Sequence, residues 1–212
     1  MYRPALPRVL RAPLLAASVV AAVLVAALAL VYADTSTAGP FDAWQLGLMP
    51  RDPAFALLFD WLGEPVGFVT MMAALVGLCV ALGRFRLAVA AVLAQAATGL
   101  ACSLLKEAVG RTIHGVFLSY PSGHTAVVTT AGLVTGVLLA EVLRLLRATA
   151  TTIVLGITLA CGAFAGWAQA STAAHYPTDT IGGFCVAVAL FAPVALAIDY
   201  VGDRWSAAGV TR

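Results

Sequence analysis

Three short polar stretches lie far apart along this 212-residue chain: Lys106–Arg111, Pro121–His124 and His175–Asp179. Asp179 follows His175 by four positions, so on a helix the two side chains lie on one face. A carboxylate that accepts the Nδ1–H of a histidine fixes its tautomer and leaves Nε2 free to act as a nucleophile. We therefore predict an oriented, nucleophilic histidine at position 175.

The stretch Pro121–His124 precedes a long apolar run and is typical of the start of a helix. Ser122 can cap that helix, and Gly123 allows a ligand to approach the backbone closely. The free N–H groups of such a turn bind anions readily, and His124 would then lie in the first turn beside the anion. The alternative is a plain helix cap with a histidine that takes no part in chemistry.

Lys106 is the single lysine in a chain with eleven arginines. A compact ammonium group on a flexible stem suits contact with a phosphate oxygen, although a lysine at a helix end can also extend towards the membrane surface without further function. His114 has no partner implied by its spacing, and we expect it to be a solvated loop residue.

The chain that must position these residues is unusually apolar. It is 62% hydrophobic and 10% charged, with a mean hydropathy of +0.98, whereas soluble domains are about 45–50% apolar and about 25% charged. So few charges exclude a soluble enzyme, and a net charge of +2 argues against a nucleic-acid partner. We expect one membrane-embedded domain over residues 1–212, with four cysteines that act as small apolar residues because no paired spacing indicates zinc or a disulfide.

The elements that could span a membrane are six continuous apolar runs, since a spanning helix needs about 20 such residues. They are Ala12–Ala33, Val66–Leu82, Leu87–Leu105, His124–Leu143, Thr151–Trp167 and Thr180–Ile198. The first run can also be read as a signal peptide, but its length exceeds the roughly 7–15 apolar residues of that signal and favours a retained span. The predicted fold class is all-α, an integral membrane bundle of six transmembrane helices.

Basic residues predict the orientation of the bundle. With the N-terminus inside, the cytoplasmic segments hold Arg3, Arg8, Arg11, Arg84, Arg86, Arg144, Arg147, Arg204 and Arg212, and the outer segments hold Arg51, Lys106 and Arg111. This bias follows the positive-inside rule. We therefore expect a multi-pass protein of the cytoplasmic membrane with both termini in the cytoplasm and the three polar stretches on the extracytoplasmic side.

The outer loop Asp34–Pro65 combines acidic residues with apolar side chains at near-helical spacing. These side chains are Trp44, Phe55, Leu58, Phe59, Trp61 and Leu62. The pattern predicts a short extracytoplasmic amphipathic helix at the membrane interface. A packed lid is favoured over a substrate gate.

Taken together, the polar stretches resemble the type 2 phosphatidic acid phosphatase family, whose pattern is K-x6-R-P, then P-S-G-H, then S-R-x5-H-x3-D. Lys106 matches the start of the first part, Pro121–His124 matches the second, and His175-x3-Asp179 matches the third. The resemblance covers residues 87–191, the expected motif-bearing core. The six spans predicted over the whole chain also match the layout of the family.

Two departures from the family pattern stand out. Ile113 and His114 replace the expected R-P, and Ala168 and Gln169 replace S-R. Arg111 resembles an additional arginine of some members and could take over the first lost charge. Loss of an arginine clamp weakens phosphate binding, because hydrogen bonds to charged groups are worth about 1.5–3 kcal/mol.

The resemblance implies dephosphorylation of a lipid phosphate or diphosphate without a metal or other cofactor. His175 would form a phosphohistidine, Asp179 would orient it, and His124 would act as the general acid and base. The implied phosphate-binding residues are Lys106, Arg111, Ser122 and Gly123. The substrate would be a lipid of the bilayer, such as a polyprenyl carrier lipid, its phosphosugar conjugate, phosphatidic acid or phosphatidylglycerol phosphate.

Three other functions are open at this stage. A head-group phosphotransferase would pass the phosphoryl group to an alcohol, and a degenerate, non-catalytic protein would only bind lipid phosphate. A transporter or structural bundle fits less well, because the ionisable groups lie at the ends of the spans. The sequence indicates neither the particular lipid nor the oligomeric state.

Overall fold

The structure is a computed structural model, and it describes residues 3–49 and 53–209. The helices of this part are α1 (Arg8–Tyr32), α2 (Pro40–Leu48), α3 (Pro53–Asp60), α4 (Pro65–Ala81), α5 (Phe85–Val109), α6 (Gly123–Val142), α7 (Arg147–Ser171) and α8 (Pro177–Gly209). Strands β1 (Thr112–Ile113) and β2 (Phe117–Leu118) form a small antiparallel hairpin between α5 and α6. Arg51 and Arg212, which entered the orientation argument, lie outside the described residues.

Among the described residues, five helices are long and apolar enough to cross a membrane: α1, α5, α6, α7 and α8. Helix α4 corresponds to the predicted span Val66–Leu82 and has 17 residues, a rise of about 26 Å against a hydrocarbon core of about 30 Å. It joins α3 at a bend of 57°, and the pair together meets the same test. The all-α membrane bundle is thus confirmed, with six spans if this bent pair counts as one.

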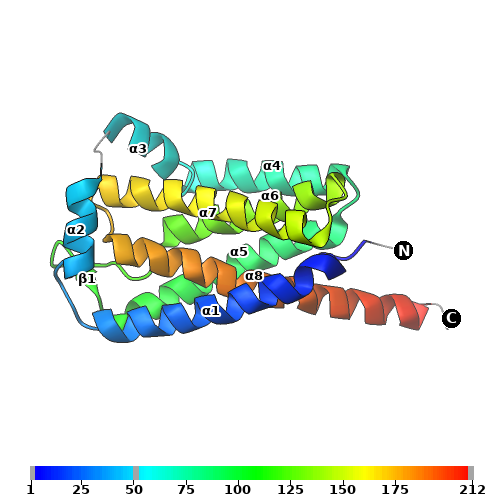
Figure 1. Cartoon of the computed structure of the whole chain (residues 1–212), viewed down its shortest axis with the longest axis horizontal. Helices are drawn as coiled ribbons and strands as arrows, with labels where there is room; N and C mark the ends of the chain where they lie inside the picture. Colours follow the sequence, from blue (N-terminus) through cyan, green and yellow to red (C-terminus); the bar gives the residue numbers. More distant parts are fainter. Residues whose placement is uncertain (1–2, 50–52, 210–212) are drawn as a thin grey trace.

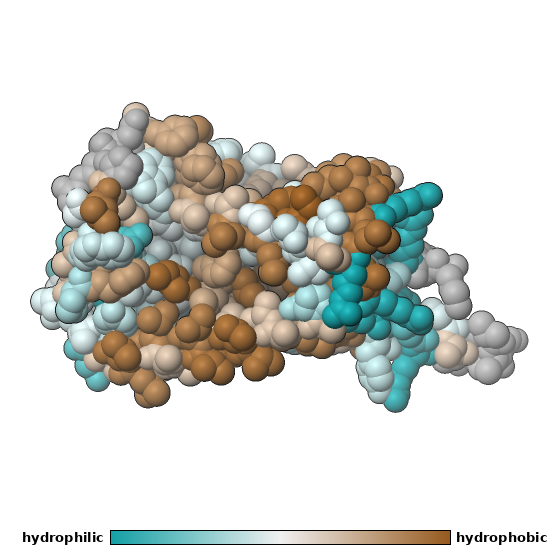
Figure 2. Space-filling model, in the orientation of Figure 1, coloured by the Kyte–Doolittle hydropathy of each residue, from teal (hydrophilic) through white to brown (hydrophobic). Residues whose placement is uncertain are grey.

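The long helices run side by side, and α2 lies across one end of them (Figure 1). Both termini lie at the opposite end, as an even number of crossings requires. Apolar residues cover the middle of the face in Figure 2, and hydrophilic residues gather at the end with the termini. This banding is what a protein that crosses a bilayer presents to lipid.

Helix α6 is at the centre of the bundle and has the largest buried share of the five spans. It packs most extensively against α7, whereas α8 packs chiefly against α1 and α5. Helices α7 and α8 therefore make less contact with each other than either makes with its main partner.

The segment between α1 and α4 contains two short helices, not the single amphipathic helix that the sequence predicted. Prolines begin both, Pro40 in α2 and Pro53 in α3, because proline fits the first turn of a helix but interrupts its interior. The aromatic side chains are divided accordingly, and Trp44 on α2 and Phe55 on α3 are both exposed. These are apolar surfaces of the kind found at a membrane interface.

Ion pairs hold the elements together at the end with the termini. Arg11 and Arg86 lie near the buried Asp199 of α8, at 3.1 and 3.7 Å. Arg84, which directly precedes α5, pairs with Glu141 of α6. The basic residues of the α4–α5 and α6–α7 turns share this end with the start of α1, so the described residues preserve the charge asymmetry seen in the sequence.

Candidate active site

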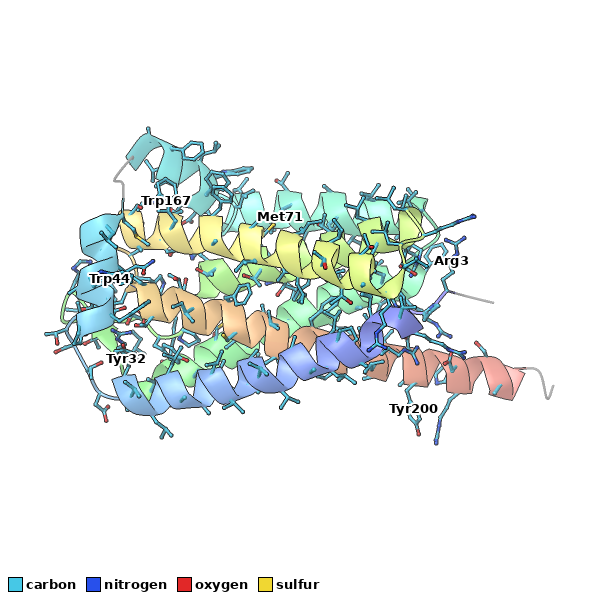
Figure 3. The ribbon with its side chains drawn as sticks, in the orientation of Figure 1. Arg3, Tyr32, Trp44, Met71, Trp167 and Tyr200 are labelled. Carbon is cyan, nitrogen blue, oxygen red and sulfur yellow. The ribbon has the colours of Figure 1, made fainter. Side chains whose placement is uncertain are left out.

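The three polar stretches meet at the end of the bundle opposite the termini, the left-hand end of Figure 3. Lys106 lies in the last turn of α5, Ser122 directly precedes α6, and His175 lies in the short turn before α8. The Ser122 N–H donates to the Asp179 carbonyl at 2.9 Å. This bond joins the start of α6 to the start of α8, and with them two of the polar stretches.

Ser122 caps α6, because its Oγ accepts a hydrogen bond from the Thr125 N–H at 3.4 Å. Gly123 and His124, the first residues of the helix, have N–H groups without partners inside the helix. A Cβ on Gly183 of α8 would overlap the Ser122 carbonyl, so this glycine allows α8 to pack against the cap. The result is a fixed helix N-terminus whose partial positive charge faces the end of the bundle.

His175 is buried, with only 8% of its surface exposed. Its Nδ1 lies 3.7 Å from Asp179 Oδ2, which is longer than a hydrogen bond but close enough for a strong electrostatic interaction. Burial lowers the pKa of His175, Asp179 opposes this shift, and the charges of Lys106 and His124 add to it. A lowered pKa favours the neutral imidazole, the state that a nucleophile needs.

A buried ion cluster lies behind His175. The guanidinium of Arg111 donates to Asp179 Oδ1, Asp42 Oδ2 and the Thr178 hydroxyl, each at 2.6 Å. Asp42 also accepts hydrogen bonds from the Thr178 N–H and hydroxyl. All three charged side chains are fully buried, so α2 is tied to the start of α8.

Two tyrosines cover the faces of the Arg111 guanidinium. The rings of Tyr32 and Tyr176 have their centroids 4.1 and 4.3 Å from its central carbon, a favourable arrangement for a cation. Arg111 was expected to bind phosphate, yet here protein groups surround it. Asp42 was not recognised in the sequence as part of the site, because it lies 69 positions from Arg111 and no local spacing connects the two residues.

Lys106 and His114 bind the backbone around the site. Lys106 is half-buried, and its ammonium donates to the Leu118 carbonyl at 3.1 Å. His114 is exposed, as predicted for a loop residue, but its Nε2 lies 2.8 Å from the Ala173 carbonyl. It therefore connects the β-hairpin to the turn that leads into His175.

On the other side of the site, His124 meets the elbow between α3 and α4. Its Nε2 lies 3.4 Å from Glu64 Oε1, and a Cβ on Gly63 would overlap its ring. Asp60 accepts a hydrogen bond from the amide of Gln169. No local spacing predicts these contacts, because Glu64 lies 60 positions from His124 and Asp60 lies 109 positions from Gln169.

A family model described as the PAP2 superfamily matches residues 100–203 of the chain. The chain belongs to the PAP2 superfamily. This membership indicates phosphatase activity on phosphate esters, often those of lipids. No curated protein and no solved structure gave a match.

The PAP2 match contains all three polar stretches but not the helices that cover them. Asp42 of α2, Asp60 at the end of α3 and Glu64 directly before α4 lie outside the matched residues. Gln169, which replaces the arginine of the PAP2 pattern, faces one of these additional carboxylates. The helices α2 and α3 that cover the site therefore lie outside the residues matched to the family.

Proposed function

We propose that the protein hydrolyses a lipid phosphate or diphosphate at the extracytoplasmic face of the membrane, through a phosphohistidine on His175. The observation that carries this proposal is the buried His175 beside Asp179, within the electrostatic reach of Lys106 and His124. A nucleophile, a carboxylate that orients it and two groups that can carry positive charge are the parts needed for metal-free phosphoryl transfer.

The first step transfers the phosphoryl group from lipid to protein. His175 Nε2 attacks phosphorus while the bond to the lipid oxygen breaks, and His124 gives a proton to that leaving oxygen. In the second step His124 takes a proton from water, whose oxygen attacks phosphorus. The P–N bond then breaks, which releases phosphate and restores His175.

The transferring oxygens would be held by Lys106, the Ser122 hydroxyl and the first N–H groups of α6, beginning with Gly123. Charge concentrates on these oxygens in the transition state, where fixed donors are most effective. Arg111 takes a revised role in this proposal. Because its guanidinium is buried between Asp42 and Asp179, it positions Asp179 and does not contact the phosphate directly.

An apolar groove of about 670 Å³ between α7 and α8 supports a lipid substrate. Its walls include Leu48 of α2, Leu159 and Trp167 of α7, and Ile181 and Phe184 of α8. Pro177 and Thr180 also line the groove and flank Asp179 in the sequence. A hydrocarbon chain in the groove would thus leave its phosphate near the start of α8, beside His175.

The test is phosphate release by detergent-purified protein in the presence of chelator. The panel would contain phosphatidic acid, phosphatidylglycerol phosphate, and polyprenyl mono- and diphosphates. We expect release from at least one lipid, lost in His175→Ala and largely kept in the matched control His114→Ala. Full turnover by His175→Ala would contradict the proposal, and accumulation of a phosphorylated alcohol in place of phosphate would identify a transferase.

A further inference from the structure

The elbow between α3 and α4 brings two carboxylates to His124. Asp60 ends α3 and Glu64 directly precedes α4. One oxygen of each carboxylate and one ring nitrogen of His124 all lie within 4.8 Å of one another. The three groups are half-buried or exposed, so they are accessible from solvent.

Unlike Asp42 and Asp179, these two carboxylates have no arginine or lysine partner in the described part of the chain. Asp42 and Asp179 share the buried Arg111. Asp60 accepts a hydrogen bond from the neutral amide of Gln169, and Glu64 pairs with His124. The two negative charges of Asp60 and Glu64 thus lie beside the proposed phosphate site. A cation bound between them would remove their repulsion of each other and of the phosphate.

The elbow is held in place, so the groups are arranged before any ligand arrives. The Phe59 ring stacks on Phe164 of α7 with centroids 5.1 Å apart, and Phe55 packs on Trp167 at 5.7 Å. Gln169, which fixes Asp60, is only 2% exposed. Gly63 lies directly against the His124 ring, where no side chain would fit.

We infer that Asp60, Glu64 and His124 form a zinc-binding site, and that zinc bound there inhibits the enzyme. Zinc prefers imidazole nitrogen and carboxylate oxygen as ligands, about 2.0–2.2 Å from the metal and so about 3.3 Å from each other. The His124–Glu64 separation of 3.4 Å already matches this spacing. Calcium and magnesium require more oxygen ligands than these residues offer.

The inhibition follows from the role of His124 and therefore rests on the proposed function. A zinc ion on Nε2 occupies the lone pair that must accept a proton from water in the second step. The ion would act as a reversible inhibitor and not as a cofactor. Phosphate release would be fastest with chelator and would fall as free zinc rises.

The first arm of the test measures binding without any lipid. Tag-free protein in detergent is titrated with Zn²⁺ by calorimetry, alongside Asp60→Asn/Glu64→Gln and the matched control Glu107→Gln, an exposed carboxylate at the same end of the bundle. We expect one zinc per chain, bound at least about tenfold more weakly by the double variant and unchanged in the control. Equal affinity in all three proteins would overturn the site.

The second arm measures phosphate release as free zinc rises. Neither Asp60 nor Glu64 takes part in the proposed reaction, so the double variant should keep its basal release and need at least about tenfold more zinc for half-inhibition. The inference fails if the double variant is as sensitive as the parent. Absence of release from every lipid would refute the proposed function, while the binding arm would still decide the zinc site.

Discussion

At the scale of single residues, Asp179 connects the reacting histidine to the rest of the fold. Its Oδ2 accepts the Tyr176 N–H at 3.0 Å and lies 3.7 Å from His175, while Oδ1 is bound to Arg111. Asp42 completes this cluster from outside the matched family residues. A residue of α2 thereby fixes the carboxylate that is proposed to orient His175.

Substitution of Asp42 tests this connection. Asp42→Asn keeps the shape of the side chain but leaves Arg111 with one carboxylate instead of two. We expect the free energy of unfolding to fall by about 1–3 kcal/mol, seen as a Tm several degrees lower in detergent, together with slower phosphate release. Glu107→Gln is the control, and an Asp42→Asn protein with parental Tm and release would show that the cluster does not support the site.

The dependence of activity on pH tests the environment of His175. Only its neutral form attacks, and its pKa is lowered by burial and by the charges of Lys106 and His124, against the opposing effect of Asp179. The neutral form of His175 is therefore maintained at pH values below the ordinary histidine pKa of about 6.5. We expect kcat/KM to be maintained over the same range of pH.

Substitution of Lys106 removes one of the charges that act on the pKa of His175, so the direction of the resulting shift can be predicted. Lys106→Met takes away a charge that lowers the pKa of His175, so the acid limb of kcat/KM moves to higher pH. The maximal rate also falls, by about 10²–10³-fold, because a phosphate-binding charge is lost. The substrate titrates identically with both proteins, so an acid limb that stays in place or moves to lower pH would contradict this description of the site.

At the scale of elements, α7 and α8 form the groove assigned to the lipid chain. Ala163→Trp places a large side chain on its wall. We expect a higher KM for a long-chain lipid phosphate and little change for a short, water-soluble phosphate ester. The matched control is Ala160→Trp, which adds the same side chain to an exposed position of α7 that does not line the groove. If Ala160→Trp raised KM as much as Ala163→Trp, the groove would be excluded as the chain-binding site. The same conclusion would follow if Ala163→Trp raised KM equally for the long-chain and the short substrate.

The sequence predicted the long elements well and the short ones poorly. Continuous apolar runs are a strong local signal, and each of the six predicted runs corresponds to a helix. The segment between α1 and α4 was harder to predict, because its proline residues divide one apparent amphipathic pattern into two helices, α2 and α3. Pairing of Asp60 with Gln169 and of Glu64 with His124 depends on how the elbow folds back, which no local spacing reveals.

The site was predicted to a similar, partial extent. Lys106, His124, His175 and Asp179 were assigned to the candidate site from the sequence, because their spacing is local or matches a family pattern. Arg111 was identified as well, but the structure surrounds it with Asp42, Asp179 and two tyrosines. A sequence shows that an arginine is present, whereas only the fold shows which charges it neutralises.

At the scale of the whole molecule, both termini lie at one end and the site at the other (Figure 1). The arginine bias predicts that the end with the termini is cytoplasmic. Val116 at the tip of the β-hairpin and Leu146 between α6 and α7 are 74% and 81% exposed at opposite ends. Each is a suitable position for a reporter cysteine.

Labelling of these positions in intact cells tests the orientation. Val116→Cys should react with a membrane-impermeant thiol reagent, whereas Leu146→Cys should react only after permeabilisation. The parent chain, with its four free cysteines inside the spans, gives the background. The reverse pattern would place the site in the cytoplasm.

The most direct test of the central claim is detection of the phosphorylated protein itself. Purified protein would be mixed with a lipid substrate that it turns over, quenched at alkaline pH during turnover, digested and mapped by mass spectrometry. We predict phosphate on His175 in the parent protein and none at this position in His175→Ala. Phosphate on another residue, or steady turnover by the parent without any phosphate on His175 at any quench time, would contradict the account.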